Sequence, residues 1–281
     1  MTERLSVARA AHHAREALEG GDPVVGLTVL ESSPGGPAAG ERMCVWAGRH
    51  AGTLGDANLD AAALRIARSA LADDTRPGSA EVEADGARVT VYLEPHAPPP
   101  ELVIVGAGHV ARPLCQVGAM LGFRVTVLDD RPEFATRERF PDAAQVRRAD
   151  FADPFRGIRI TPRTFLVLVT RGHKYDFEAL RGILLGPSLP AYVGMIGSRR
   201  RTRAALEALA AEGIAADRLR AVHAPIGLDV GAETPEEIAV SIAAELVMIR
   251  RGGTGQPLRD RERVADRWVT RGRGAAEAEA E

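Results

Sequence analysis

Apolar and polar residues repeat with a helical period at the start of the chain and then in shorter, strand-like runs. Residues 3 to 19 place their apolar side chains at helical spacing, and the Gly-Gly-Asp-Pro run that follows ends the pattern. Apolar or alternating runs predict strands at 24–30, 43–46 and 88–93, and an Ala-rich run predicts a helix at 59–71. Residues 1–95 therefore predict a small N-terminal α/β domain.

From residue 102 onward, short apolar runs alternate with segments of helical period. The predicted strands are 102–105, 124–128, 165–169 and 191–196, and the predicted helices are 110–121, 174–184, 199–212 and 235–250. This alternation is typical of a parallel sheet covered by helices. We therefore expect a Rossmann-like, doubly wound α/β domain over residues 101–251.

Two further segments follow neither pattern. Prolines at 95, 98, 99 and 100 enforce extended backbone, so residues 96–100 are predicted to link the two domains. Residues 252–281 are charged and repetitive and have no apolar face, which predicts a flexible tail. A length of 281 residues leaves room for this two-domain organisation.

Composition restricts the classes of function. The net charge is −2 and 45% of the residues are hydrophobic, so the chain carries no bulk positive field for nucleic acid. No apolar run approaches the roughly 18 residues of a membrane span. The two cysteines, Cys44 and Cys115, lack the spacing of a disulfide framework or a zinc module, and no metal ligand is assigned. We expect a cytoplasmic protein that binds neither nucleic acid nor membranes.

The sequence GAGHVA at 106–111 follows a predicted buried strand and opens a predicted helix, which is the context of a dinucleotide-binding turn. Gly106 allows the tight turn, Gly108 lets phosphate approach the backbone, and the small Ala111 lets the helix pack closely on the sheet. Amides at the start of that helix would face the anion. His109 lies in the same loop and is counted with the candidate ligand contacts. The other interpretation is a plain strand-to-helix turn.

The next predicted strand ends in acidic residues about twenty positions after the first glycine, where a ribose-binding acid is expected. Asp129 is the candidate, and the alternative is a solvated acid at a strand end. Arg131 could stack on a base or meet a 2′-phosphate. Asp129 therefore favours NAD, and Arg131 leaves NADP open.

The sequence TRGHKYD at 170–176 follows the predicted strand at 165–169, at the edge where open parallel sheets place ligand-binding loops. Thr170, His173 and Asp176 are candidates to face the ligand. His173 could act as a general acid or base oriented by Asp176. The same His/Asp spacing suits an ordinary helix start, and both interpretations stay open.

The sequence GMIGSRRRTR at 194–203 also follows a strand and opens a helix. Gly197, Ser198, Arg199 and Arg200 combine backbone amides, a hydroxyl and guanidinium groups, which suit a phosphate or a pterin-like phosphate ester. The alternative is a solvated basic helix start, which the helix dipole disfavours.

A loop with the sequence PIGLD precedes the last predicted helix. Gly227 could place backbone at the mouth of the sheet and contact the ligand there. A plain connecting loop is the equally weighted alternative. The Thr-Pro-Glu-Glu run that follows is a capping box with proline at the first helical position, which is structural.

Five motifs occur in order over residues 101–251: VIVGAGHVA, VLDDRPEFA, TRGHKYD, YVGMIGSRRR and PIGLDVGAETPEEIAVSIAAE. In this order they resemble the Rossmann-type domain of the XdhC/CoxI family, accessory proteins for molybdenum hydroxylases such as xanthine dehydrogenase and carbon monoxide dehydrogenase. The first domain is similar more weakly, through its Ser-Ser-Pro loop and Gly-Thr turn.

The resemblance implies a function in the maturation of a molybdenum hydroxylase. Such a chaperone binds the molybdenum cofactor transiently, assists its sulfuration by a cysteine desulfurase and delivers it to the apo-hydroxylase. The family carries a Gly-Gly-Cys-hydrophobe-Glu signature where this chain reads Asp56-Ala57-Asn58-Leu59-Asp60. Asn58 stands at the cysteine position, and an amide cannot carry sulfur as a thiolate does.

The alternative function is an NAD(P)-dependent oxidoreductase that uses the same glycine turn, with His173 and Asp176 as its catalytic pair. The small amount of sequence left after the Rossmann-like domain argues against it, because no substrate domain follows. The client enzyme, the mononucleotide or dinucleotide form of the pterin, and homodimer formation are left open by the sequence.

Overall fold

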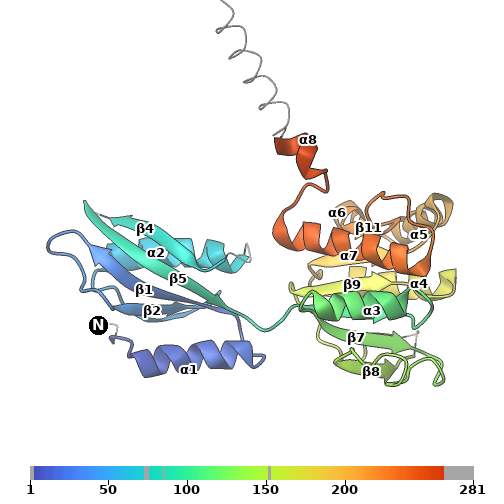
Figure 1. Cartoon of the computed structure of the whole chain (residues 1–281), viewed down its shortest axis with the longest axis horizontal. Coiled ribbons are helices and arrows are strands. Elements are labelled where there is room, and N and C mark those ends of the chain that lie inside the picture. The colour runs from blue at the N-terminus through green and yellow to red at the C-terminus, as the bar shows by residue number, and fades with distance from the viewer. Residues whose placement is uncertain (1–2, 73–75, 85, 151–152, 263–281) are drawn as a thin grey trace, which may run out of the picture. The chain divides into compact units, whose positions relative to one another are not determined.

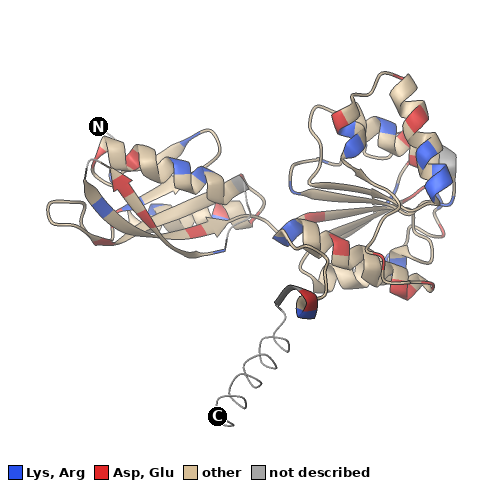
Figure 2. Ribbon diagram, turned by 90° about the horizontal axis from the view of Figure 1, so that it is seen from above, with Lys and Arg blue, Asp and Glu red and all other residues tan. Residues whose placement is uncertain are grey.

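The computed structural model describes residues 3–72, 76–84, 86–150 and 153–262 (Figure 1). The chain separates into two compact units, one ending at Pro100 and the other beginning at Glu101. Acidic and basic residues are interspersed over both units, in keeping with the small net charge (Figure 2).

The first unit is one antiparallel sheet with a helix on each face (Figure 1). The strand order is β3-β2-β1-β5-β4, with β1 Val24–Ser32, β2 Arg42–Val45, β3 His50–Gly52, β4 Gly78–Ala84 and β5 Ala87–His96. Helix α2, Ala57–Ala72, covers the larger apolar core, and α1, Val7–Leu18, covers a smaller one that includes Cys44 and Trp46. Each face of the sheet therefore buries its own set of alternating side chains.

Several boundaries in this unit differ from the predictions for physical reasons. Helix α1 begins at Val7 instead of residue 3 because the hydroxyl of Ser6 caps it, accepting from the Arg9 amide at 3.3 Å. Strand β5 continues through Pro95 to His96, into the predicted linker. Proline is tolerated there because β4 begins opposite Leu93, so Pro95 needs no amide on that side. Strands β3 and β4 were not predicted.

The second unit is built on a parallel sheet and confirms the predicted Rossmann-like fold class. Its strand order is β11-β10-β9-β6-β7-β8. The strands are β6 Glu101–Val105, β7 Arg124–Asp129, β8 Gln145–Arg148, β9 Thr164–Leu168, β10 Tyr192–Met195 and β11 Val222–His223. This is the order of a dinucleotide-binding sheet, and the chain changes direction of winding between β6 and β9. Strands β8 and β11 were too short and too polar to be predicted.

Helices cover both faces of this sheet (Figure 1). Helices α3, Ala111–Met120, and α7, Pro235–Arg251, pack on one face, and α4, His173–Leu184, and α5, Arg199–Ala211, pack on the other. The short helices α6, Ala216–Arg220, and α8, Leu258–Glu262, complete the unit. Helix α8 lies within the predicted tail, and residues 263–281 of that prediction lie outside the described residues. Over the described ranges, no helix is long and apolar enough to cross a membrane.

Candidate functional site

The predicted ligand-binding segments meet at the carboxyl edge of the parallel sheet. The glycine turn follows β6, the acidic residues follow β7, the Thr170 loop follows β9, and the arginine-rich helix start follows β10. Because β7 and β9 both pair with β6, their loops flank the glycine turn on its two sides. This arrangement makes the end of β6 the centre of the candidate site.

Gly106 and Gly108 serve different purposes in the turn. Gly106 has φ +105°, and a Cβ there would lie 2.6 Å from the carbonyl oxygen of Val169. Only glycine allows this approach between the turns after β6 and β9. At Gly108, an added Cβ would have no heavy atom within 4 Å. Gly108 therefore leaves open space in front of the backbone, as a phosphate cradle requires.

The start of helix α3 has the properties of an anion site. Its N-cap residue, Val110, has a helical backbone and no side-chain capping bond. The first amides of α3 are therefore not satisfied by a side chain. Ala111 is fully buried in the core against the sheet, and His109 is exposed in the same turn. The small side chain of Ala111 is thus compatible with close packing of α3 on the sheet.

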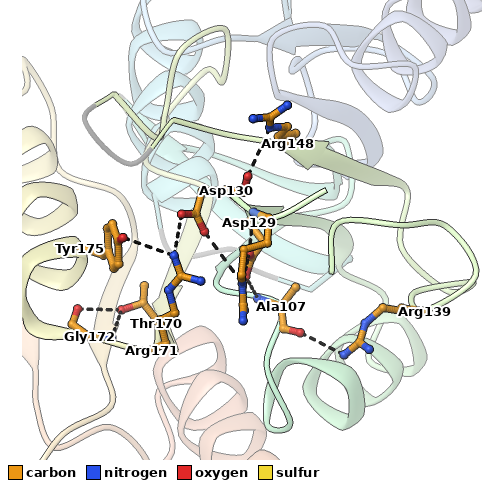
Figure 3. A network of polar contacts seen from close by, with 10 residues as sticks. Ala107, Asp129, Asp130, Arg139, Arg148, Thr170, Arg171, Gly172 and Tyr175 are labelled. Carbon is orange, nitrogen blue, oxygen red and sulfur yellow. Dashed lines mark hydrogen bonds and ion pairs between the residues drawn. The ribbon is translucent and has the colours of Figure 1, made fainter. Parts of the chain in front are cut away.

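Asp129 is held by the chain itself (Figure 3). Its residue is 1% exposed, Oδ2 accepts from the Ala107 amide at 2.7 Å, and Oδ1 accepts from the Arg131 amide and Nε at 3.0 and 2.9 Å. Burial alone would raise the pKa of Asp129, but the bonds from Arg131 and Ala107 outweigh it and hold the pKa below its ordinary value. A ribose hydroxyl could reach this carboxylate only by displacing Arg131.

Two guanidinium groups stack on one aromatic ring beside the turn. Arg131 and Arg139 lie 3.5 and 4.6 Å from the centre of the Phe134 ring. Arg139 also donates to the carbonyl oxygen of Ala107 at 3.3 Å (Figure 3). Arg131, predicted to meet a base or a 2′-phosphate, instead contacts Asp129 and Phe134 in this structure. The turn therefore has two cationic side chains beside it.

Asp130 and Arg171 form an ion pair next to the turn, with 2.8 Å between Oδ2 and Nη2 (Figure 3). The same Nη2 donates to the hydroxyl of Tyr175 at 3.3 Å. The hydrogen bond to Tyr175 and then the charge of Asp130 raise the pKa of Arg171. Neither charged residue was singled out from the sequence, because each lies beside a residue that fits a known motif better.

A hydrogen bond between Thr170 and Asp176 holds the loop that follows β9. The hydroxyl of Thr170 donates to Oδ1 of Asp176 at 2.6 Å, and Asp176 is 8% exposed in the first turn of α4. This contact braces the loop. The side chain of His173 lies outside the described residues, so the predicted catalytic pair is not tested.

Helix α5 begins with an ordinary cap. The hydroxyl of Ser198 accepts from the Arg201 amide at 3.4 Å, and Arg199 and Arg200 are exposed. A Cβ at Gly197 would make no close contact, so no tight packing requires this glycine. An open groove of about 400 Å³ lies along α5 and is lined by Arg199, Thr202, Arg203, Leu206, Glu207, Ala210, Ala224 and Pro225. Arg199 thus lies at the edge of this groove.

Gly227 belongs to a buried polar cluster centred on Glu245. Oε2 of Glu245 accepts from the Tyr192 hydroxyl at 2.6 Å and from the Gly227 amide at 2.7 Å, and Oε1 accepts from Nδ1 of His223 at 2.9 Å. Gly227 has φ +98°, and a Cβ there would lie 2.4 Å from Oγ of Ser241. A larger residue at position 227 would therefore clash with α7, and the Gly227 amide points toward Glu245. Burial and the hydrogen bond to Glu245 raise the pKa of Tyr192, so the Tyr192 hydroxyl stays a donor.

Sequence reasoning assigned no chemistry to Glu245. The available signal was a carboxylate three residues after Ile242 and next to Leu246, on the apolar stripe of α7. A charged residue on a buried face indicates a buried partner.

The residues around Asn58 hold the Gly-Thr turn of the first unit. Asp60 accepts from the Thr53 hydroxyl at 2.7 Å and from the Leu54 amide at 2.6 Å, and Asp56 caps α2 through the amides of Asn58 and Leu59. Asn58 is exposed in the first turn of α2.

Both cysteines are buried and neither lies at the Gly-Thr turn. Cys44 and Cys115 are 2% and 1% exposed, and burial raises the pKa of each to about 11. Among the described residues, no cluster of His, Cys, Asp and Glu could hold a metal ion.

Comparisons with known proteins agree with the geometry. The family model of the XdhC Rossmann domain matches residues 102–246, and that of the XdhC and CoxI family matches residues 8–82. An uncharacterised Escherichia coli protein, YqeB, is 31% identical over 83% of this chain and 44% of its own length. A Bacillus subtilis protein described as a probable component of xanthine dehydrogenase is 32% identical over 57% of this chain and 46% of its own length.

The chain spans less than half the length of these two relatives. A crystal structure of a xanthine dehydrogenase from Bacillus halodurans matches with a TM-score of 0.50 and 20% identity, covering 87% of this chain and 96% of that one. At this identity the likeness supports the fold. The two family models together span both units, and the chain belongs to the XdhC and CoxI family.

Proposed function

We propose that this protein assists the maturation of a molybdenum hydroxylase such as xanthine dehydrogenase, and that it binds the molybdenum cofactor as transient cargo. Family membership and the similarity to a probable xanthine dehydrogenase component support the choice of client. Sulfuration with a cysteine desulfurase and insertion into the apo-hydroxylase are the steps in which we expect it to act.

The glycine turn is the part of the chain best suited to hold the cargo by its phosphate. The observation that carries this proposal is the open space at Gly108 in front of a helix start without a side-chain cap. Amides and the helix dipole at that point attract an anion. Arg139 adds positive charge at the rim, whereas the charge of Arg131 is balanced by Asp129. A pterin phosphate or its dinucleotide form has the anionic group that this arrangement suits.

NAD(P) would use the same turn, so the ligand itself must be identified. The experiment is to purify the protein, release any bound molecule and look for a fluorescent oxidised pterin and for nicotinamide absorbance. We expect pterin. Tight NAD(P) with substrate-dependent reduction would instead assign the turn to an oxidoreductase.

Gly108→Val tests whether the ligand lies in the turn. Because a Cβ at Gly108 meets no other atom, the variant should fold normally and lose the ligand. Gly48→Val is the matched control, since its Cβ also meets no atom within 4 Å and it lies in the first unit. Retention of the ligand by Gly108→Val would contradict the proposed site. A pull-down with an apo-hydroxylase and with a cysteine desulfurase tests the partners.

A further inference from the structure

The ion pair between Asp130 and Arg171 connects the two segments that flank the glycine turn. Asp130 directly follows β7, and Arg171 lies just beyond β9. Since β6 lies between these strands, their ends are about 10 Å apart, and the two side chains bridge that distance. The pair therefore spans the end of the strand that leads into the turn (Figure 3).

Each member of the pair is next in sequence to a residue that contacts the turn. Asp129 accepts from the amide of Ala107, and Cα of Thr170 lies 3.0 Å from where a Cβ of Gly106 would stand. Arg171 and Asp130 are thus tied to the walls of the candidate site by their own backbone neighbours.

The bonding of both side chains is incomplete. Oδ1 of Asp130 is buried without a hydrogen-bond partner among the described residues, and Nε of Arg131 is 4.0 Å away from it. Within the part of the chain that the structure describes, Nε and Nη1 of Arg171 have no hydrogen-bond partner, and the side chain is 42% exposed. Because the Arg171 side chain is not buried, it can turn toward another anion without disturbing the core.

We propose that Arg171 is a binding residue for the phosphate groups of the ligand in the glycine turn, and that Asp130 competes for it in the ligand-free protein. This inference rests on the proposed function, because it takes an anionic ligand in the turn as given. Asp129 cannot take the place of Asp130, since both its oxygens are already bonded to Ala107 and Arg131.

Arg171 should leave Asp130 for the ligand because its contact with a phosphate is stronger than its contact with a carboxylate. An ion pair as exposed as this one is weak, because water screens it. A diphosphate offers more negative charge and accepts two parallel bonds from a guanidinium group. Ligand binding should therefore draw Arg171 away from Asp130 and open the link across the end of β6.

The test is calorimetric titration of the full chain with ADP as a diphosphate probe, and with adenosine as the phosphate-free control. Arg171→Gln should weaken ADP binding by about tenfold or more, since a charged hydrogen bond is lost. Asp130→Asn should tighten it by about two- to fivefold, the worth of an exposed ion pair. The double variant should match Arg171→Gln, because Asp130 acts only through Arg171. Adenosine binding should not change.

Two further variants make the test specific. Glu212→Gln breaks a similarly exposed ion pair with Arg181, at 2.6 Å, and should leave ADP affinity unchanged. Arg171→Lys keeps the positive charge but cannot form bidentate hydrogen bonds, so it should bind ADP with intermediate affinity. The melting temperature of each variant shows whether it is folded.

Two results would overturn the inference. Weaker ADP binding by Asp130→Asn would make Asp130 a direct ligand contact instead of a competitor, and unchanged binding by Arg171→Gln would remove Arg171 from the site. If Gly108→Val abolishes ADP binding while these variants behave like wild type, the glycine turn stands and only this inference fails. If wild type does not bind ADP, this inference fails, while the release of bound pterin still decides the proposed function.

Discussion

Gly106 and Gly108 differ in what an added side chain would meet, although a sequence motif treats them alike. Gly106→Ala forces a side chain into a positive-φ position and against the carbonyl of Val169 at 2.6 Å. We expect it to lower the free energy of unfolding by about 2–4 kcal/mol. Gly108→Ala should change it by less than about 0.5 kcal/mol. Urea denaturation of the two variants measures the difference, and equal losses would contradict this account of the turn.

Asp129 links the turn to the pH dependence of stability. Its pKa is lower in the folded chain than in the unfolded one, so its contribution is complete above the unfolded pKa of about 3.9 and is lost as pH falls through the folded value. Asp129→Asn should therefore be less stable than wild type at neutral pH, by about 1–3 kcal/mol. The difference should shrink below about pH 4.

Urea midpoints across this pH range give the measurement for Asp129. Asp142→Asn, which changes an exposed acid of the same unit, serves as the control for net charge. A constant difference between Asp129→Asn and wild type at every pH would rule out the proposed electrostatic cause.

Helix α7 owes its position to a carboxylate as well as to its apolar stripe. Glu245→Ala would leave the Tyr192 hydroxyl and the Gly227 amide without their acceptor, and we expect a loss of about 3–5 kcal/mol. Glu245→Gln keeps the shape and should cost less. Glu236→Ala changes an exposed acid in the same helix and should have a small effect. Thermal unfolding followed by circular dichroism separates these outcomes.

The elements that could be predicted from sequence are those whose burial follows a simple period. Strands β6 and β9 are buried along nearly their whole length and read as continuous apolar runs. In β4 only Val82 is fully buried, so the sequence GSAEVEA carries no alternation strong enough to find. Edge strands such as β4 and β8 gain most of their order from pairing with a neighbour, which a local pattern does not contain.

The candidate site shows the same division between local and long-range information. The glycine turn and Ala111 follow from local backbone requirements and were found in the sequence. The pairing of Asp130 with Arg171 joins residues 41 positions apart, and that of Tyr192 with Glu245 joins residues 53 apart. Such contacts depend on the strand order, which must be known before the partners can be named.

At the scale of the whole molecule, the two units contribute different chemistry. The second unit gathers its amides, arginines and acids at one edge of a parallel sheet. The first unit presents the Gly-Thr turn and the start of α2, where this chain has Asn58 and the resemblance to the family implies a cysteine. A thiol at that position would lie in the first turn of α2 and would be as exposed as Asn58 is.

Asn58→Cys tests that expectation. Its thiol should be exposed, as Asn58 is, and should react quickly with a thiol reagent at neutral pH. Wild type should react slowly, because burial raises the pKa of Cys44 and Cys115 to about 11. Labelling rates followed by mass spectrometry give the comparison. Rapid labelling of the wild-type chain would show that one of the native cysteines is accessible after all.

The burial of both native thiols limits how sulfur can travel. Within these 281 residues, no exposed cysteine is present to receive a persulfide from a donor. If sulfur is added to a cargo while it rests on this protein, the donor enzyme must reach the cargo itself. This protein would then present the bound cargo to the active site of the donor enzyme. No covalent intermediate would form on this protein during the transfer.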